Sequence, residues 1–233
     1  MNILCVKLGT KYPSEMVNNL FRMCIKNVTT PFEFFCYTDD RSGIIPNINI
    51  IRYVDNGLDL AVYNKLYLFS EEFDNQIPEG PRVYFDLDLV IINNIDNIVN
   101  DNKDELSLIR PSWREEQQYG PPTWHHMFNS SCMTWTSPNT RCLWEHLQRD
   151  PEMFMAKYKW GMDSFMFYEH KNAGTNIHYF QPNNFCSYIY GVGLGCFRPI
   201  EGTPPIILFN GAPKDKNQCI DAYNTYFKRF YGC

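Results

Sequence analysis

Short apolar runs alternate with amphipathic stretches along the first half of the chain. Short apolar runs bounded by turn residues are typical of buried strands, and apolar residues that recur every three or four positions indicate helices. The predicted strands are residues 3–6, 32–37, 48–54 and 83–85, and the predicted helices between them are residues 14–27 and 61–73. This alternation favours an α/β sheet domain.

The second half continues the pattern less regularly. Strands are predicted at residues 106–109, 129–135, 177–180 and 206–209, and helices at 140–148 and 162–168. Between them, residues 110–127 are rich in Pro, Trp, Gln and Tyr without periodicity, which predicts a long functional loop or lid. Because no internal repeat or linker interrupts the chain, we expect a single domain over residues 1–233.

Aromatic residues near the C-terminus form one stripe at helical spacing. They are Tyr223, Tyr226, Phe227, Phe230 and Tyr231. Such a stripe predicts a helix that closes the hydrophobic core. The alternative is a peripheral contact with a membrane surface, helped by the neighbouring basic pair Lys228 and Arg229.

Composition narrows the class of protein. The 233 residues include 21 Lys and Arg against 26 Asp and Glu, and the formal net charge of −5 argues against phosphate neutralisation on nucleic acid. No apolar run reaches the roughly 18 residues that a membrane span needs, and Lys7 interrupts the first run before a signal sequence forms. Nine cysteines without a zinc-type spacing favour reduced thiols. We therefore expect a cytoplasmic protein with no nucleic-acid partner and no transmembrane segment.

Two aspartates follow the predicted strand at residues 83–85. In an extended segment Asp86 and Asp88 point the same way and can converge on one hard divalent cation, while Leu87 points elsewhere. About one Asp-x-Asp triplet of this kind is expected by chance in a chain of this aspartate content. Here, however, an apolar run also follows at residues 89–92, and burying two carboxylates costs several kcal/mol unless a cation compensates them. The triplet therefore predicts a metal site at the end of a buried strand.

Several other short motifs stand in a specific order along the chain. Together with the aspartate triplet they are residues 7–12 (KLGTKY), 36–40 (CYTDD), 63–66 (YNKL), 84–91 (YFDLDLVI), 128–133 (FNSSCM), 161–163 (GMD) and 209–214 (FNGAPK). In this order the chain resembles glycosyltransferases of the GT-A fold, and most closely the short viral, phage and bacterial ones. The resemblance implies one α/β, Rossmann-like domain with a central mixed, mostly parallel sheet flanked by helices. Residues 1–100 would form the nucleotide-binding half, and residues 101–233 the acceptor-binding half with the closing helix.

The resemblance also implies a site for a nucleoside diphosphate sugar, UDP-linked rather than GDP-linked, with Mn²⁺ or Mg²⁺. The residues it implies for the donor and its cation are Lys7, Gly9, Thr10, Lys11, Tyr12, Asp39, Asp40, Lys65, Asp86, Leu87, Asp88, Asn129, Gly211 and Lys214. Residues 7–12 would line the nucleotide, with Tyr12 offering a face for the base. Asp39 and Asp40 would lie near the base or ribose, and the alternative for them is a solvated turn. Asn129 would bind hydroxyls of the donor sugar.

Two residues are implied to act in catalysis. Lys65 would be the fixed positive charge for the diphosphate, and its alternative is an exposed helical lysine. Asp163 matches a position that faces the sugar or the acceptor, where it would serve as a base or an orienting carboxylate. Asp163 fits equally well as the N-cap of the helix predicted at residues 162–168.

The chain departs from the related pattern Phe-His-Gly-x-Pro-Lys-Pro near its C-terminus. Asn210 stands where the pattern has a metal-binding histidine, and Asp215 stands where it has the last proline. Either the Asn210 carbonyl oxygen is a third ligand beside Asp86 and Asp88, or two protein ligands, phosphate and water hold the metal. Lys214 is retained and would reach the phosphates.

The function implied is the metal-dependent transfer of a hexosyl or deoxyhexosyl group from the nucleotide sugar to a hydroxyl of a glycan or glycoconjugate. If the protein is viral, like some of the members it resembles, its cytoplasm would be that of a host. The alternatives are a sugar-phosphate nucleotidyltransferase and a catalytically inactive, carbohydrate-binding GT-A module. The sequence leaves open whether transfer inverts or retains the anomeric configuration.

Overall fold

A central sheet organises the computed structural model, which describes residues 1–58, 63–101, 105–111, 113, 127–136, 138–189, 204–209 and 216–232, without the side chains of 216–218. The seven strands lie in the order β3 (Asn49–Arg52), β2 (Glu33–Thr38), β1 (Asn2–Lys7), β4 (Pro81–Phe85), β7 (Asn129–Thr136), β6 (Leu106–Ile109) and β8 (Ile177–Tyr179). Only β7 runs antiparallel to its neighbours, β4 and β6, among these described strands. The expected mixed, mostly parallel sheet is thereby confirmed.

A second, smaller sheet lies beside the central one. Its order is β5 (Leu89–Ile91), β10 (Ile206–Leu208) and β9 (Phe185–Ser187), with β5 antiparallel and β9 parallel to β10. β5 begins directly after Asp88, and the backbone N–H of Phe209 donates to the carbonyl of Asp88 over 2.8 Å. The small sheet therefore fixes the backbone on the far side of the aspartate triplet.

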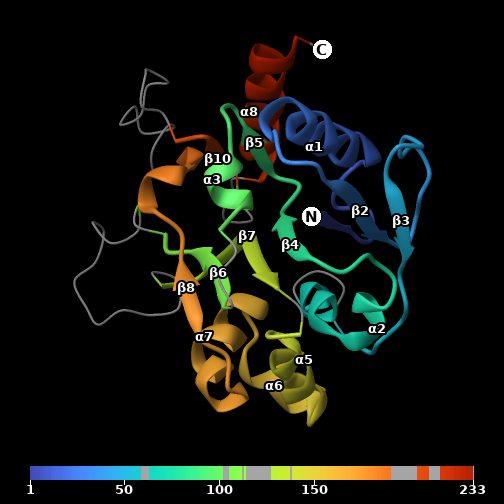
Figure 1. Ribbon diagram of the computed structural model, residues 1–233, viewed down its shortest axis with the longest axis vertical. Coiled ribbons are helices and arrows are strands. Elements are labelled where there is room, and N and C mark those ends of the chain that lie inside the picture. The colour runs from blue at the N-terminus through green and yellow to red at the C-terminus, as the bar shows by residue number, and fades with distance from the viewer. Residues whose placement is uncertain are drawn as a thin grey trace.

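Helices cover both faces of the central sheet (Figure 1). On one face, α1 (Ser14–Asn27) and α8 (Lys216–Tyr231) pack beside the small sheet. On the other lie the 3₁₀ helix η1 (Asn64–Phe69) and four α-helices: α2 (Glu71–Asp74), α5 (Arg141–Gln148), α6 (Pro151–Lys157) and α7 (Met162–Ala173). Two short helices, α3 (Asp96–Val99) and η3 (Pro182–Asn184), complete the described elements.

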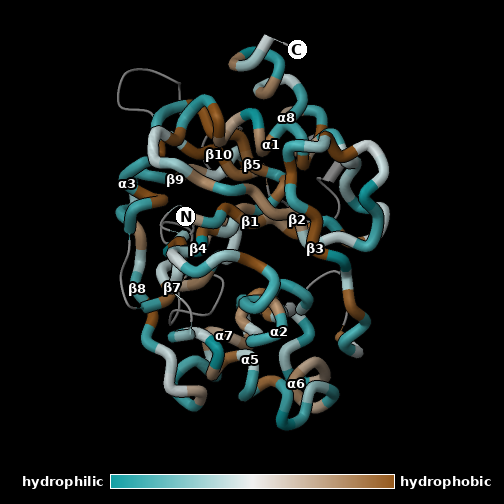
Figure 2. The backbone as a smooth tube through the Cα atoms, turned by 45° about the vertical axis from the view of Figure 1, so that its right-hand side comes forward, coloured by the Kyte–Doolittle hydropathy of each residue, from teal (hydrophilic) through white to brown (hydrophobic). Residues whose placement is uncertain are grey.

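The strands alternate their side chains between two hydrophobic cores. In β4, Val83 and Phe85 lie in the first core, under α1 and α8, whereas Tyr84 lies in the second core, under η1 and α5. This alternation follows from the two-residue period of extended backbone. Figure 2 shows the hydrophobic segments β1, β2, β5 and β10 running through the middle of the molecule. The strand that leads to Asp86 and Asp88 is therefore buried on both faces.

The aromatic stripe of α8 packs inward. Tyr223 and Phe227 are buried in the first core, and the Tyr231 hydroxyl accepts a hydrogen bond from the Asn27 amide of α1 over 2.6 Å. The prediction of a helix that closes the core is confirmed.

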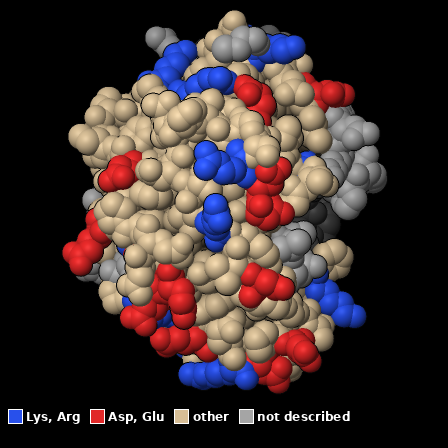
Figure 3. All heavy atoms as spheres, turned by 90° about the vertical axis from the view of Figure 1, so that its right-hand side faces the viewer, with Lys and Arg blue, Asp and Glu red and all other residues tan. Residues whose placement is uncertain are grey.

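Among the described residues, none of the helices combines the length and hydrophobicity that crossing a bilayer demands. On the face drawn in Figure 3, acidic and basic side chains are interspersed.

The prediction of one continuous helix at residues 61–73 is wrong. In the part that the structure describes, η1 ends at Phe69, and α2 starts after Ser70. Ser70 is extended, and its hydroxyl oxygen accepts the N–H of Phe73 over 3.0 Å, which caps a new helix. Leu66, Phe69 and Phe73 are nevertheless buried, as their spacing predicted.

Candidate active site

The carboxyl ends of β1, β2 and β4 meet at one edge of the central sheet, because these strands are parallel neighbours. The loops that follow them touch: the N–H of Gly9 donates to Oδ2 of Asp39 over 3.0 Å. The antiparallel strand β7 starts at the same edge, where the carbonyl of Ser131 accepts the N–H of Asp86 over 2.8 Å. Open α/β sheets bind their ligands at this edge. The sheet therefore gathers most of the described candidate residues in one place.

Asp86 is held by two donors from two elements. Its Oδ1 accepts the Tyr84 hydroxyl over 2.5 Å and pairs with the Lys65 ammonium at 2.6 Å. Tyr84 and Asp86 share one side of the extended chain, since they are two residues apart. Burial alone would raise the pKa of Asp86, but the Lys65 charge together with the hydrogen bonds from Lys65 and Tyr84 holds this pKa below its ordinary value. Asp86 is thus an ionised carboxylate with a fixed orientation.

Asp88 is held differently. Its Oδ2 accepts the hydroxyl of Tyr12, from the loop after β1, over 2.6 Å. Burial, and then the negative charge of Asp86, raise the pKa of Asp88 above its ordinary value. Between the two aspartates, the Leu87 side chain lies in the first core, so only the Leu87 backbone faces the site. Asp88 therefore carries a charge that an added cation would stabilise.

Lys65 links the aspartate triplet to the start of β7. Its ammonium lies 3.3 Å from the Ser130 hydroxyl and 5.1 Å from the centre of the Tyr84 ring. The Lys65 side chain is only 20% exposed. Burial by itself would lower the pKa of Lys65, but the carboxylates of Asp86 and Asp163 raise it above its ordinary value. Lys65 is therefore a protonated, partly buried cation and not an exposed helical lysine.

Asp163 lies beside the same point. Its Oδ1 accepts the backbone N–H of Ser130 over 3.2 Å, and burial raises its pKa. The N-cap of α7 is Gly161, with φ 91° and ψ −158°, and Asp163 is the second residue of the helix. The alternative interpretation of Asp163 as the N-cap is therefore wrong. Asp163 and Lys65 therefore both contact Ser130: Asp163 accepts from its backbone N–H, and Lys65 donates to its hydroxyl.

The remaining described candidates lie around this group. Lys7 and Asn129 are buried, and Oδ1 of Asn129 accepts the N–H of Ser131 over 3.0 Å, whereas Thr10 and Lys11 are exposed. Asp40 is exposed, and its Oδ1 accepts the N–H of Ser42 over 2.8 Å, which lowers the pKa of Asp40. This contact agrees with the turn interpretation of Asp40. Three predicted residues, Asn210, Gly211 and Lys214, lie outside the described residues.

The two aspartates fit a hard divalent cation. Among the described residues, their side-chain hydrogen bonds end on Oδ1 of Asp86 and Oδ2 of Asp88, so one oxygen of each carboxylate is left for a cation. Carboxylate oxygens suit Mg²⁺ and Mn²⁺. In the described part of the chain, no group of three or more His, Cys, Asp or Glu side chains forms a metal cage. A cation bound here would need further ligands from phosphate, water or elsewhere in the chain.

Sequence reasoning missed the hydrogen bonds of two tyrosine hydroxyls, since it expected Tyr12 to contact the base and included Tyr84 only in a motif. Tyr84 could have been found, because it stands two residues before Asp86 on an extended segment and therefore on the same side. Tyr12 is 76 residues from Asp88, and its contact depends on β1 and β4 being neighbours. Ser130 was noticed only as part of a motif, and its contacts with Lys65 and Asp163 likewise depend on the sheet order.

Comparison with known proteins shows which solved structures share this fold. No protein-family profile and no curated protein sequence matches the chain. Among solved structures, it is similar to the glycosyltransferase GlyE of Streptococcus pneumoniae TIGR4, with 10% identity and a TM-score of 0.60 over 99% of this chain and 64% of GlyE. It is also similar to the galactosyltransferase LgtC, solved with donor and acceptor sugar analogues, with 11% identity and a TM-score of 0.57 over 97% of this chain and 96% of LgtC. At such identities the likeness shows the fold alone, and the chain has the fold of the GT-A glycosyltransferases.

Proposed function

We propose that the protein is a glycosyltransferase that moves a sugar from a nucleoside diphosphate sugar to a hydroxyl of a glycan or glycoconjugate. One observation carries the proposal: Asp86, Lys65, Ser130 and Asp163 are joined by consecutive contacts at the carboxyl edge of the sheet. The fold shared with GlyE and LgtC supports the same function.

The chemistry required is cleavage of the bond between the sugar C1 and the diphosphate oxygen. That step becomes easier when positive charge faces the departing diphosphate. Asp86 and Asp88 would hold a Mn²⁺ or Mg²⁺ ion, which supplies charge to the phosphates when bound. Lys65 adds a second, permanent positive charge beside Asp86, and its position is set by Asp86 and Ser130.

Asp163 would act on the sugar or the acceptor. Asp163 and Lys65 both contact Ser130. The raised pKa of Asp163 makes its carboxylate a better proton acceptor than that of an ordinary aspartate. We assign it the role of a base or of a carboxylate that orients a hydroxyl. The position of Asp163 relative to C1 of a bound donor decides between inversion and retention.

The nucleotide would lie over the loops that follow β1 and β2. Lys7, Gly9 and Asp39 stand at the ends of these neighbouring strands, and the Gly9–Asp39 hydrogen bond joins the two loops. We propose a UDP-linked hexose or deoxyhexose as the donor. Asn210 and Lys214 would complete the contacts to the metal and the phosphates.

The test is the release of nucleoside diphosphate from a panel of UDP- and GDP-sugars, with Mn²⁺ or Mg²⁺ and with EDTA. We expect metal-dependent release from one donor class. Pyrophosphate release from a nucleoside triphosphate and a sugar phosphate would identify a nucleotidyltransferase instead. Binding of a sugar without turnover on any donor would identify a carbohydrate-binding module.

A further inference from the structure

Each aspartate of the triplet is held by one tyrosine hydroxyl. Tyr84, in β4, donates to Asp86, and Tyr12, in the loop after β1, donates to Asp88. The two tyrosines differ in their surroundings. Tyr84 is fully buried within the sheet, whereas Tyr12 is partly buried against the first core. The donor to Asp88 therefore belongs to a loop, and the donor to Asp86 belongs to the rigid sheet.

The Tyr12 hydroxyl can only donate to Asp88 when it is protonated. A phenol, whose ordinary pKa is about 10, keeps its proton at neutral pH, and Asp88 is therefore the acceptor in the 2.6 Å contact. A carboxylate that accepts one such bond on Oδ2 loses rotational freedom, and its Oδ1 is held in one direction.

The loop of Tyr12 is also tied to the next strand. Gly9, three residues earlier, donates its N–H to Asp39 after β2. The Lys11 ammonium lies 4.4 Å from the centre of the Tyr12 ring. A ligand that orders residues 9–12 would therefore also fix the hydroxyl that holds Asp88.

We propose that Tyr12 is a positioning residue that presents Asp88 to the divalent cation and couples binding of the cation to binding of the nucleotide. This inference rests on the proposed function, because it takes the two aspartates as the cation ligands and the loop at residues 7–12 as part of the nucleotide site. Tyr84 orients Asp86 in the same way but, being within the sheet, does not respond to the nucleotide.

The test is calorimetric titration with Mn²⁺ of the wild type, Tyr12→Phe and Tyr84→Phe, each with and without UDP. Loss of a hydrogen bond that orients a metal ligand typically weakens metal affinity 10- to 100-fold. We expect both variants to bind Mn²⁺ at least about tenfold more weakly. The increase in Mn²⁺ affinity produced by UDP should shrink in Tyr12→Phe and stay at the wild-type ratio in Tyr84→Phe.

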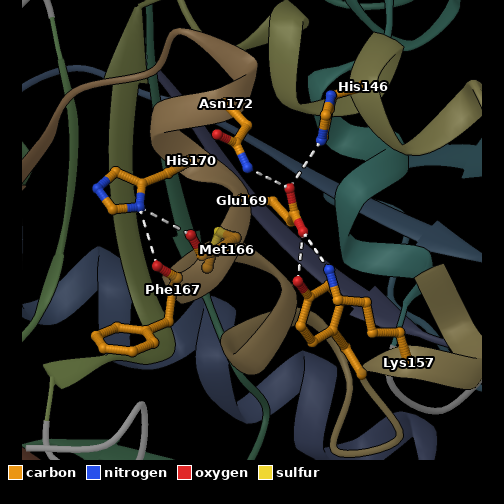
Figure 4. A network of polar contacts seen from close by, with 8 residues as sticks. His146, Lys157, Met166, Phe167, Glu169, His170 and Asn172 are labelled. Carbon is orange, nitrogen blue, oxygen red and sulfur yellow. Dashed lines mark hydrogen bonds and ion pairs between the residues drawn. The ribbon is translucent and has the colours of Figure 1, made fainter.

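The matched control is Tyr158→Phe. The Tyr158 hydroxyl donates to the buried carboxylate of Glu169 and, among the described residues, contacts neither Asp86 nor Asp88. Figure 4 shows the other contacts of Glu169. This variant should bind Mn²⁺ like the wild type. Should Tyr12→Phe unfold, as judged by its circular dichroism, Tyr12→His replaces it, because a ring nitrogen that donates to Asp88 should restore part of the affinity.

Three results would overturn the inference, and they are distinguishable. If the wild type binds Mn²⁺ with UDP and Tyr12→Phe binds it equally well, Tyr12 has no positioning role, and the proposed function stands. The coupling is equally refuted if UDP raises the affinity of both tyrosine variants by the same ratio. If the wild type binds no Mn²⁺ with or without UDP, the metal site of the proposed function fails together with this inference.

Discussion

The ammonium of Lys65 lies 2.6 Å from Oδ1 of Asp86, and both side chains are 20% exposed. The pair joins η1 to the end of β4. Along the chain these two elements are separated by the segment that includes the turn at residues 75–80. Because the same ammonium reaches the Ser130 hydroxyl, one cation fixes three segments at the edge of the sheet. The consequences of removing it are therefore both structural and chemical.

Replacing Lys65 with Met removes the cation but keeps most of the side-chain volume. Asp86 then keeps only the Tyr84 hydroxyl as a described donor, and the free energy of unfolding should fall by about 1–3 kcal/mol. The rate of glycosyl transfer should fall by about 10²–10³-fold, because a fixed charge facing the diphosphate is lost. Chemical denaturation and steady-state kinetics measure the two effects. Lys65→Arg, which keeps the charge, serves as the control, and an unchanged rate in Lys65→Met would exclude a catalytic role.

Gly161 sets the start of α7 and hence the place of Asp163. Its φ of 91° with ψ of −158° belongs to a region that is essentially restricted to glycine, so Gly161→Ala should cost about 1–3 kcal/mol and shift the first turn of the helix. Activity should fall further than stability alone explains. Gly174→Ala is the matched control at the other end of α7, where φ is 83° and nothing lies within 4 Å of an added Cβ. Thermal melts with activity assays distinguish the two, and equal activity losses would contradict the placement of Asp163.

Glu169 fixes α7 to its neighbours. Its carboxylate accepts from His146 at 3.1 Å, Lys157 at 3.0 Å and Asn172 at 2.8 Å (Figure 4). Burial works to raise the pKa of Glu169, but these hydrogen bonds, with that of Tyr158, lower it from 4.5 to about 2. Since the folded pKa is depressed, the ionised carboxylate stabilises the fold above pH 4.5, and this stability is lost as the pH falls from 4.5 towards 2.

The matching experiment is urea denaturation of the wild type and Glu169→Gln between pH 7 and pH 2.5. Lys157 is half-exposed, so solvent screening reduces the effect, and we expect the variant to be less stable by about 2 kcal/mol at pH 7. The difference in unfolding free energy between the two proteins should narrow below pH 4.5, as the wild-type carboxylate takes up its proton. A difference that stays constant over this range would show that the charge of Glu169 is not what stabilises α7.

Asp163→Asn tests the proposed proton acceptor. Burial raises the pKa of Asp163, so a reaction that needs its ionised form should lose rate on the acid side at a pH above the ordinary aspartate value of 3.8. The variant should be slower by about 10²–10⁴-fold and should lack that acid-side dependence. The readout is the pH profile of kcat/KM for both proteins. If the variant keeps the wild-type profile, another group takes the proton.

Strand positions followed closely from the sequence. β6 was predicted with its observed bounds, and β1, β2 and β7 within one or two residues, because runs of apolar residues between turn residues mark buried strands. The break at Ser70 was not predictable from the spacing of apolar residues, since Phe73 continues the helical period across it. The short elements α6 (Pro151–Lys157) and β9 were missed, because a few residues carry too little periodicity.

The candidate site was predictable in its residue types but not in its contacts. The spacing of Asp86 and Asp88 indicated a cation site, and their place after β4 follows from the apolar run before them. The bond from Tyr12 to Asp88 depends on which strands are neighbours, and a sequence pattern does not specify strand order. The same holds for Lys65, whose partners lie in β7 and after β4.

The rate of UDP release from a UDP-sugar in the presence of Mn²⁺, compared between the wild type and Asp88→Asn, tests the central claim most directly. Asp88→Asn keeps the size of the side chain and its hydrogen bond from Tyr12 but removes the charge that the cation needs. We expect turnover by the wild type that EDTA abolishes, and a rate at least about 10²-fold lower in the variant. Equal rates for the two proteins, or wild-type turnover that EDTA leaves unchanged, would contradict metal-dependent glycosyl transfer at this site.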